Sequence, residues 1–229
     1  MRRALAVVVS LLVIAGLLVG ADRGAVWLVE RQQAEQIAAD FRVTPPPRVS
    51  FAGVPFLTQL AAGRFERVDV SAAEFTVPDG ERTLTLRRVE LALTDVRGIE
   101  APVVSRLDGS GTLDWAGVGA LVGQPVSYAE PGRIRVDYRA EVFGASVTAR
   151  VTGTPQLDVA TQRLTLADPA VAVADYELPS GVARQLIERL AGPIPLQLPM
   201  GLRAERLQAG PDGLAVVVSG TDVPLTPPA

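Results

Sequence analysis

Residues that can do covalent chemistry are scarce in this sequence, and their scarcity restricts the function. The 229 residues include no cysteine and no histidine, and lysine and asparagine are absent as well. A serine nucleophile therefore has no histidine or lysine to activate it, and a zinc site of the usual kind has no ligands. None of the nine serines lies in a G-x-S-x-G motif, and no phosphate-binding glycine loop or acidic calcium loop occurs. We expect no metal and no cofactor.

Carboxylates are the groups left for acid–base catalysis, and their distribution argues against an enzyme. The 25 acidic residues are scattered, mostly at the polar positions of alternating segments, where a solvated face explains them. The formal net charge is −3, and without Arg2 and Arg3 the count is 20 basic against 25 acidic residues, or −5. The basic surface typical of a nucleic-acid-binding protein is missing. We predict a non-enzymatic protein that does not bind nucleic acid.

The first 21 residues have the pattern of a targeting segment. Two arginines precede an uncharged run over residues 4–21, which is long for a signal-peptide core and just long enough to span a bilayer. The arginines favour a cytoplasmic N-terminus, whereas Val19, Gly20 and Ala21 fit the small-residue pattern of a cleavage site. A cleaved signal peptide and a retained anchor both stay open, and the length favours the anchor. Residues 22–229 are then exported as one domain, which has no disulfides and depends on its core.

Periodicity predicts an α+β fold with mainly antiparallel strands. A helix is expected over residues 22–41, before the prolines at 45–47, and Trp27 fits either a membrane interface or the core. From Arg64 onward apolar residues alternate with period two, most clearly over residues 133–142. Further strands are expected at residues 82–96, with a bulge at Arg87 and Arg88, and at 162–167, 171–178, 202–209 and 214–219. Short helices are expected at residues 113–123 and 180–192.

Helices are few for so many half-apolar strands, so the apolar face of the sheet needs another cover. The sheet could close on itself or form a sandwich. It could also curl strongly around one long helix and leave an apolar furrow that binds a long apolar ligand. The charge-free, proline-rich stretch at residues 191–202 fits a lip of such a furrow, and equally a segment tucked under the domain. Phenylalanine is concentrated too, because five of six lie between residues 41 and 75.

Two stretches carry a resemblance to a known family. Residues 53–60, GVPFLTQL, followed by Arg64 and a strand at 68–70, resemble the signature of the LmeA family of actinobacterial envelope proteins. Residues 198–203, LPMGLR, are similar to that family's C-terminal pattern, while residues 100–180 match only as generic strands. The resemblance implies a phospholipid-binding protein with a tubular lipid-binding fold, in which a long curled sheet wraps around a helix. It also implies phosphatidylinositol-type lipids and a link to lipoglycan synthesis.

The resulting hypothesis is a phospholipid carrier or sensor at the membrane, with Pro55 breaking the chain at the mouth of the furrow. The predicted lining residues are Phe51, Val54, Phe56, Leu57, Leu60, Phe65, Ile194, Leu196, Leu198 and Met200. The candidates for the headgroup phosphate are Arg48, Arg64 and Arg67. Two alternatives stay open. The protein could be a structural partner of an envelope enzyme, with any lipid only filling its core, or a lipid hydrolase in which two acids meet at the furrow. For the site itself, the phenylalanines could merely fill the core where the helix meets the sheet.

Overall fold

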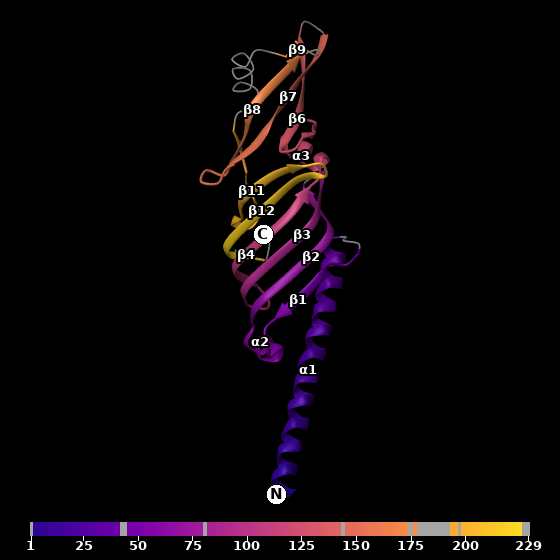
Figure 1. Ribbon diagram of the computed structural model, residues 1–229, viewed down its shortest axis with the longest axis vertical. Helices are drawn as coiled ribbons and strands as arrows, with labels where there is room; N and C mark the ends of the chain where they lie inside the picture. The colour runs from indigo at the N-terminus through magenta and orange to yellow at the C-terminus, as the bar shows by residue number, and fades with distance from the viewer. Residues whose placement is uncertain are drawn as a thin grey trace.

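The structure, a computed structural model, describes residues 2–41, 45–79, 82–142, 145–173, 176–177, 193–196 and 198–225. Its longest element is helix α1, Arg2–Phe41, which at 1.5 Å per residue is about 60 Å long. Figure 1 shows that α1 projects beyond the sheet toward the N-terminus. Within the described residues, no helix has both the length and the apolar character needed to cross a membrane. The side chains of residues 2–16, which make up most of the predicted targeting segment, lie outside the described part.

Six antiparallel strands form the sheet against which α1 packs (Figure 1). Their order is β1, β2, β3, β4, β12, β11. The strands are β1 (Arg48–Ala52), β2 (Arg64–Asp79), β3 (Arg82–Arg97), β4 (Val103–Leu113), β11 (Arg203–Gly210) and β12 (Gly213–Pro224). A seven-residue helix, α2 (Phe56–Ala62), connects β1 to β2 at one end of this sheet. Because side chains alternate along each strand, the sheet has one apolar and one polar face.

The second sheet lies at the far end of the long axis from α2 (Figure 1). Its antiparallel strands are β5 (Val126–Glu130), β6 (Arg133–Val142), β7 (Ala145–Asp158), β8 (Arg163–Val173), β9 (Tyr176–Glu177) and β10 (Ile194–Pro195). Helix α3 (Trp115–Val122) leads into this sheet and is capped by Asp114, whose side chain accepts a hydrogen bond from Gly117 N (2.8 Å). The turn η1 (Pro199–Gly201) precedes β11.

The two sheets are joined by α3 and by Gln162, whose side-chain amide bonds to the backbone of β11 as a neighbouring strand would. α3 contacts β3, β12 and β5, and β11 lies against β7. Gln162, between β7 and β8, donates from Nε2 to Ala204 O (3.0 Å), and its Oε1 accepts from Ala204 N (2.7 Å). Ala204 is only 1% exposed, so its amide and carbonyl would otherwise be buried without partners. Gln162 therefore fixes the second sheet to β11.

Among the described residues, two large apolar cores follow from this arrangement, and a smaller cluster around Val151 and Val171 lies in the second sheet. The α1-end core lies on the apolar face of the first sheet, where Ala34 and Ile37 of α1 pack. Its buried residues are Val49, Val68, Leu93, Val96, Val104, Leu107 and Val223. The junction core lies between α3 and both sheets, and its buried residues are Leu113, Val118, Val126, Ile134, Val136, Ala209 and Leu214. α1 contacts β1, β2 and α2, so it covers the end of the apolar face nearest β1.

The first sheet bends at the same level in four neighbouring strands. Two rows of inward-facing residues cross β2, β3, β4 and β12. Along each strand the two rows are three residues apart, whereas simple alternation would place them two residues apart. The first row is Phe65, Val96, Val104 and Val223, and the second is Val68, Leu93, Leu107 and Gly220. Between the rows, Asp95 and Asp222 take positive φ angles of 53° and 49°, as bulged residues do. Outside the bend, Asp95 accepts hydrogen bonds from Arg64 (2.6 Å) and Ser105 (2.7 Å).

The predicted α+β class and antiparallel pairing are confirmed, and so is the bulge in β3. Arg88 has a φ of 51°, and the β3–β4 register shifts beside it. Helix α3 matches the one expected at residues 113–123, whereas the helix expected at 180–192 lies outside the described residues. The strand break expected near residue 168 is wrong, because Asp168 enters β8 with a φ of 45° as a bulge. The long helix lies beside β1, and the strands form two sheets instead of one that wraps around it.

Candidate functional site

Three of the phenylalanines predicted to line a mouth meet at the α2 end of the molecule. The ring centroids of Phe51 and Phe56 are 5.5 Å apart, those of Phe51 and Phe65 5.2 Å, and those of Phe56 and Phe65 6.0 Å. Phe56 is 1% exposed, whereas Phe51 and Phe65 are half-buried and pack on the α1-end core. Aromatic pairs at these distances contribute about 0.5–1.5 kcal/mol beyond the area they bury. Phe56 therefore belongs to the interior and is not an accessible wall.

α1 holds α2 in place through a carboxylate. The proline before α2 makes no side-chain cap, so the first amides of the helix need an acceptor from elsewhere. Asp22 of α1 accepts a hydrogen bond from Leu57 N (2.8 Å) and pairs with Arg23 (2.7 Å). The bond from Leu57, followed by the one from Arg23, holds the pKa of Asp22 below its ordinary value. Higher on α1, Glu30 accepts a hydrogen bond from Phe51 N (2.9 Å).

The other residues of the predicted mouth are more exposed. Val54 is 73% exposed and Leu57 is 42% exposed, while Leu60 is half-buried on the same helix. The structure therefore divides the predicted mouth into a buried aromatic cluster behind α2 and an exposed apolar surface in front of it.

The described part of the proline-rich segment runs from the junction core to the α1-end core. Ile194, in β10, lines a cavity in the junction core, and Leu196 N donates to Gln162 O (2.9 Å). Leu198 is half-buried, and Met200, in η1, packs on the α1-end core. Of these four predicted lining residues, Met200 shares a core with Phe51 and Phe65.

An apolar cavity of about 50 Å³ lies in the junction core. It is lined by Trp115, Val118, Val122, Val126, Ile134, Val136, Tyr138, Pro155, Leu164, Thr165, Leu166, Ile194 and Leu214, none of which is charged. Burial raises the pKa of the Tyr138 phenol. The volume exceeds the roughly 10–15 Å³ that one water needs, but it is far below the roughly 300–1,000 Å³ of a pocket for a complete ligand. The cavity can admit the end of an apolar chain, and no acid pair meets there among the residues that the structure describes.

The three predicted headgroup arginines differ in what they can still bind. Arg64 is paired with Asp95 (2.6 Å), and Arg67 is paired with Asp69 (2.8 Å). The hydrogen bond to Asp69 is also the main reason why the pKa of Arg67 is raised. The side chain of Arg48 makes no hydrogen bond or ion pair with the part of the chain that the structure describes. Arg48 is therefore the one of the three whose guanidinium is unengaged.

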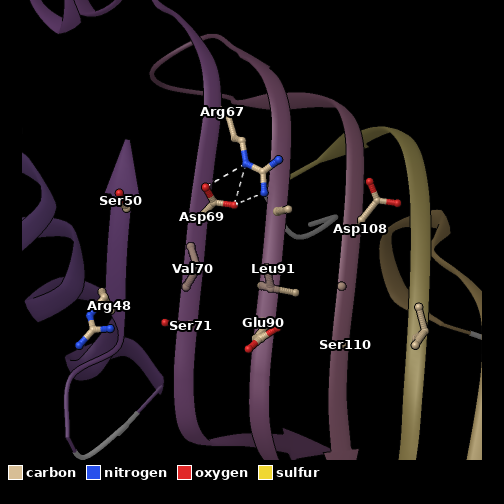
Figure 2. Close-up of a pocket in the computed structure, with 13 residues that line it drawn as sticks. Arg48, Ser50, Arg67, Asp69, Val70, Ser71, Glu90, Leu91, Asp108 and Ser110 are labelled. Atoms are coloured by element: carbon tan, nitrogen blue, oxygen red, sulfur yellow. Dashed lines mark hydrogen bonds and ion pairs between the residues drawn. The ribbon is translucent and has the colours of Figure 1, made fainter. Parts of the chain in front are cut away.

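Arg48 and Arg67 lie on the polar face of the first sheet, as Figure 2 shows. They border a cavity of about 420 Å³ that crosses β1, β2, β3, β4 and β12, and Arg48 also borders an adjoining one of about 370 Å³. The larger cavity is lined by three carboxylates as well, those of Asp69, Glu90 and Asp108. Each arginine is followed by a buried valine, Val49 or Val68, on the opposite face. The headgroup candidates and the apolar cores are thus on opposite sides of the sheet.

Of the residues that line the junction cavity, the prediction included only Ile194, although part of the signal for the others is visible in the sequence. Ile134, Val136 and Tyr138 alternate along β6 and all face the cavity. Alternation shows that they share a face, but it does not show that α3 and β8 lie opposite. That arrangement depends on pairing between segments far apart in the chain.

Comparison with known proteins gives one match. No curated protein and no solved structure matches the chain. A family model described as LmeA-like phospholipid-binding matches residues 20–219, which include α2, both sheets and the segment between the cores. The match covers most of the chain and agrees with the resemblance of residues 53–60 and 198–203. The chain therefore belongs to the LmeA-like phospholipid-binding family.

Proposed function

We propose that the protein binds phospholipid without catalysing a reaction and acts as a carrier or sensor in the cell envelope. The family provides the ligand class, and the uncharged junction cavity is the observation that carries the proposal. An acyl chain needs only apolar surface, worth roughly 0.8 kcal/mol per buried CH₂, and the cavity lining offers it. The end of the chain enters between α3 and β8, and the remainder follows the segment from Ile194 toward Met200.

The proposal also includes the location of the protein and the headgroup of the lipid. Residues 4–21 act as a signal peptide or an anchor and bring residues 22–229 to the outer side of the plasma membrane. The lipid is of the phosphatidylinositol type, as the family resemblance suggests, and its binding supports lipoglycan or envelope synthesis. Arg48 is the remaining candidate for a phosphate contact, because Arg64 and Arg67 already have carboxylate partners. It lies on the polar face of the first sheet, so the phosphate it binds is not that of a lipid whose acyl chain fills the junction cavity.

A structural role beside an envelope enzyme is the second candidate, and the small volume of the cavity favours it. A cavity of about 50 Å³ holds a lipid only if the surrounding elements move apart. If they do not, the interior is sealed and the protein acts through its surface.

Native mass spectrometry with lipid extraction, on the full chain purified from bacterial membranes, separates these two functions. A carrier retains near-stoichiometric phospholipid. Val122→Phe places a ring in the cavity and is expected to lose the lipid. Leu121→Phe is the matched control, because Leu121 is the preceding residue of α3, is 55% exposed and does not line the cavity. A lipid-free mass of the folded chain after incubation with phospholipid vesicles refutes the carrier function.

A further inference from the structure

Exposed apolar side chains gather around α2 at the end of the molecule. Val54 is 73% exposed and Leu57 42% exposed at the start of α2, and Ile99 is 64% exposed beside its end. Ile99 lies beside Gly63, the C-cap of α2, because a Cβ added at Gly63 would be 3.7 Å from Ile99 Cγ1. We call Val54, Leu57 and Ile99 the α2 patch. Large apolar residues exposed together mark a surface that is covered by a partner or a membrane.

The α2 patch lies at the level where the apolar part of α1 begins. Asp22 binds Leu57 N (2.8 Å), and Arg23 donates to Gly53 O (3.5 Å), so this turn of α1 is fixed to the start of α2. Leu17, Leu18 and Val19 are exposed on α1 within about 8 Å along the axis from Asp22, at 1.5 Å per residue. Figure 1 shows α1 leaving the molecule beside α2. The patch and the exposed apolar turn of α1 therefore lie at the same end of the molecule.

We propose that this end inserts into the outer interface of a lipid bilayer and holds the long axis of the protein away from the membrane. The inference rests on the proposed function, because it takes residues 4–21 as the segment that meets the membrane. The occupant is a bilayer because the uncharged run of α1 passes directly beside the patch. Trp27 is exposed just above, with the Arg31 guanidinium 5.7 Å from its ring centroid, which is an arrangement suited to the headgroup layer.

The attachment is apolar and not electrostatic. The arginines around the patch are already paired: Arg23 with Asp22 (2.7 Å), Arg31 with Glu35 (2.9 Å) and Arg64 with Asp95 (2.6 Å). A surface of this kind gains little from anionic lipids and is hardly screened by salt. Docking is thus expected on zwitterionic membranes, at low and high salt alike.

Single-cysteine labelling tests the docking, because the chain has no cysteine of its own. Val54→Cys and Leu57→Cys carry an environment-sensitive fluorophore in the full chain, reconstituted in phosphatidylcholine vesicles. Leu121→Cys, on an α3 residue that is 55% exposed, is the matched control. Labels at the patch should be quenched by a nitroxide on the lipid chains and be several-fold less accessible to iodide than the control. Iodide access equal to that of the control overturns the docking.

The outcomes also separate this inference from the proposed function. Phospholipid retained by the same samples is measured after extraction. Labels that iodide reaches freely, in protein that retains lipid, overturn the docking and leave the lipid-binding function intact. Labels buried in the bilayer, in protein that retains no lipid, support the docking and refute the carrier. Protection from iodide without quenching by the lipid nitroxide means that a second copy covers the patch, which also overturns the docking.

Discussion

Replacing Phe56 by alanine tests whether the aromatic cluster is interior or accessible. Phe56 is 1% exposed, and removal of a fully buried phenylalanine costs about 3–5 kcal/mol of unfolding free energy. Its two ring contacts, at 5.5 and 6.0 Å, make up about 1–3 kcal/mol of that loss. For a chain of this size, each kcal/mol lowers Tm by roughly 2–4 °C, so the expected shift is about 6–20 °C.

Urea unfolding followed by far-UV circular dichroism measures the loss. Val54→Ala is the control, because Val54 is 73% exposed in the same connection and should change stability by no more than about 0.5 kcal/mol. Phe56→Leu keeps part of the apolar volume and should fall between the two. Hydrogen exchange of the α2 amides distinguishes a local opening from a global loss. If Phe56→Ala is no more destabilising than Val54→Ala, the assignment of Phe56 to the interior is refuted.

Three further predictions concern single side chains. Gln162→Ala leaves the buried backbone of Ala204 without partners and should cost about 1–3 kcal/mol in urea unfolding, whereas Gln156→Ala, at an exposed position of β7, should cost little. The bond from α2 holds the pKa of Asp22 below 3.8, so the stability it provides is complete above that pH and is lost as the pH falls through the lowered pKa. Asp22→Asn should therefore flatten the acid end of the stability profile. Burial raises the pKa of Tyr138 above 10.0, so the wild type should lose stability as the pH rises past 10, and Tyr138→Phe should remove that part of the loss in alkaline titration.

Local patterns in the sequence predicted β2, β3, β6, β8, β11 and β12, because alternation and its interruptions depend on neighbouring residues alone. The strands β1, β4, β5 and β7 were not predicted. The parity change at Arg87 and Arg88 predicts the bulge that the register shift confirms. The same rule fails at Asp168, where an Asp-Pro pair typical of a turn is taken into β8 with a positive φ. Only the strand paired with it, β7, decides between those two outcomes.

The candidate site was less accessible to sequence reasoning, because its parts depend on distant contacts. The spacing of Phe51, Phe56 and Phe65 correctly suggests that they lie together. It does not show that Phe56 faces inward, which follows from the bond between Leu57 and Asp22, 35 residues away in the chain. The division into two sheets was missed for a similar reason, because strand pairing decides it, and pairs such as Leu113 with Leu214 lie far apart in the chain.

The bend of the first sheet restricts how this chain can change in length. Its two rows cross four strands at one level, so a one-residue deletion between Phe65 and Val68 would move only β2. On one side of the deletion, β2 would slip by one position against β3, and its buried side chains would turn to the polar face. Deletions in the four strands are tolerable only together, whereas the connecting loops can gain or lose residues one at a time. We therefore expect related proteins to keep the extra residues of all four strands together, and the curvature of the sheet with them.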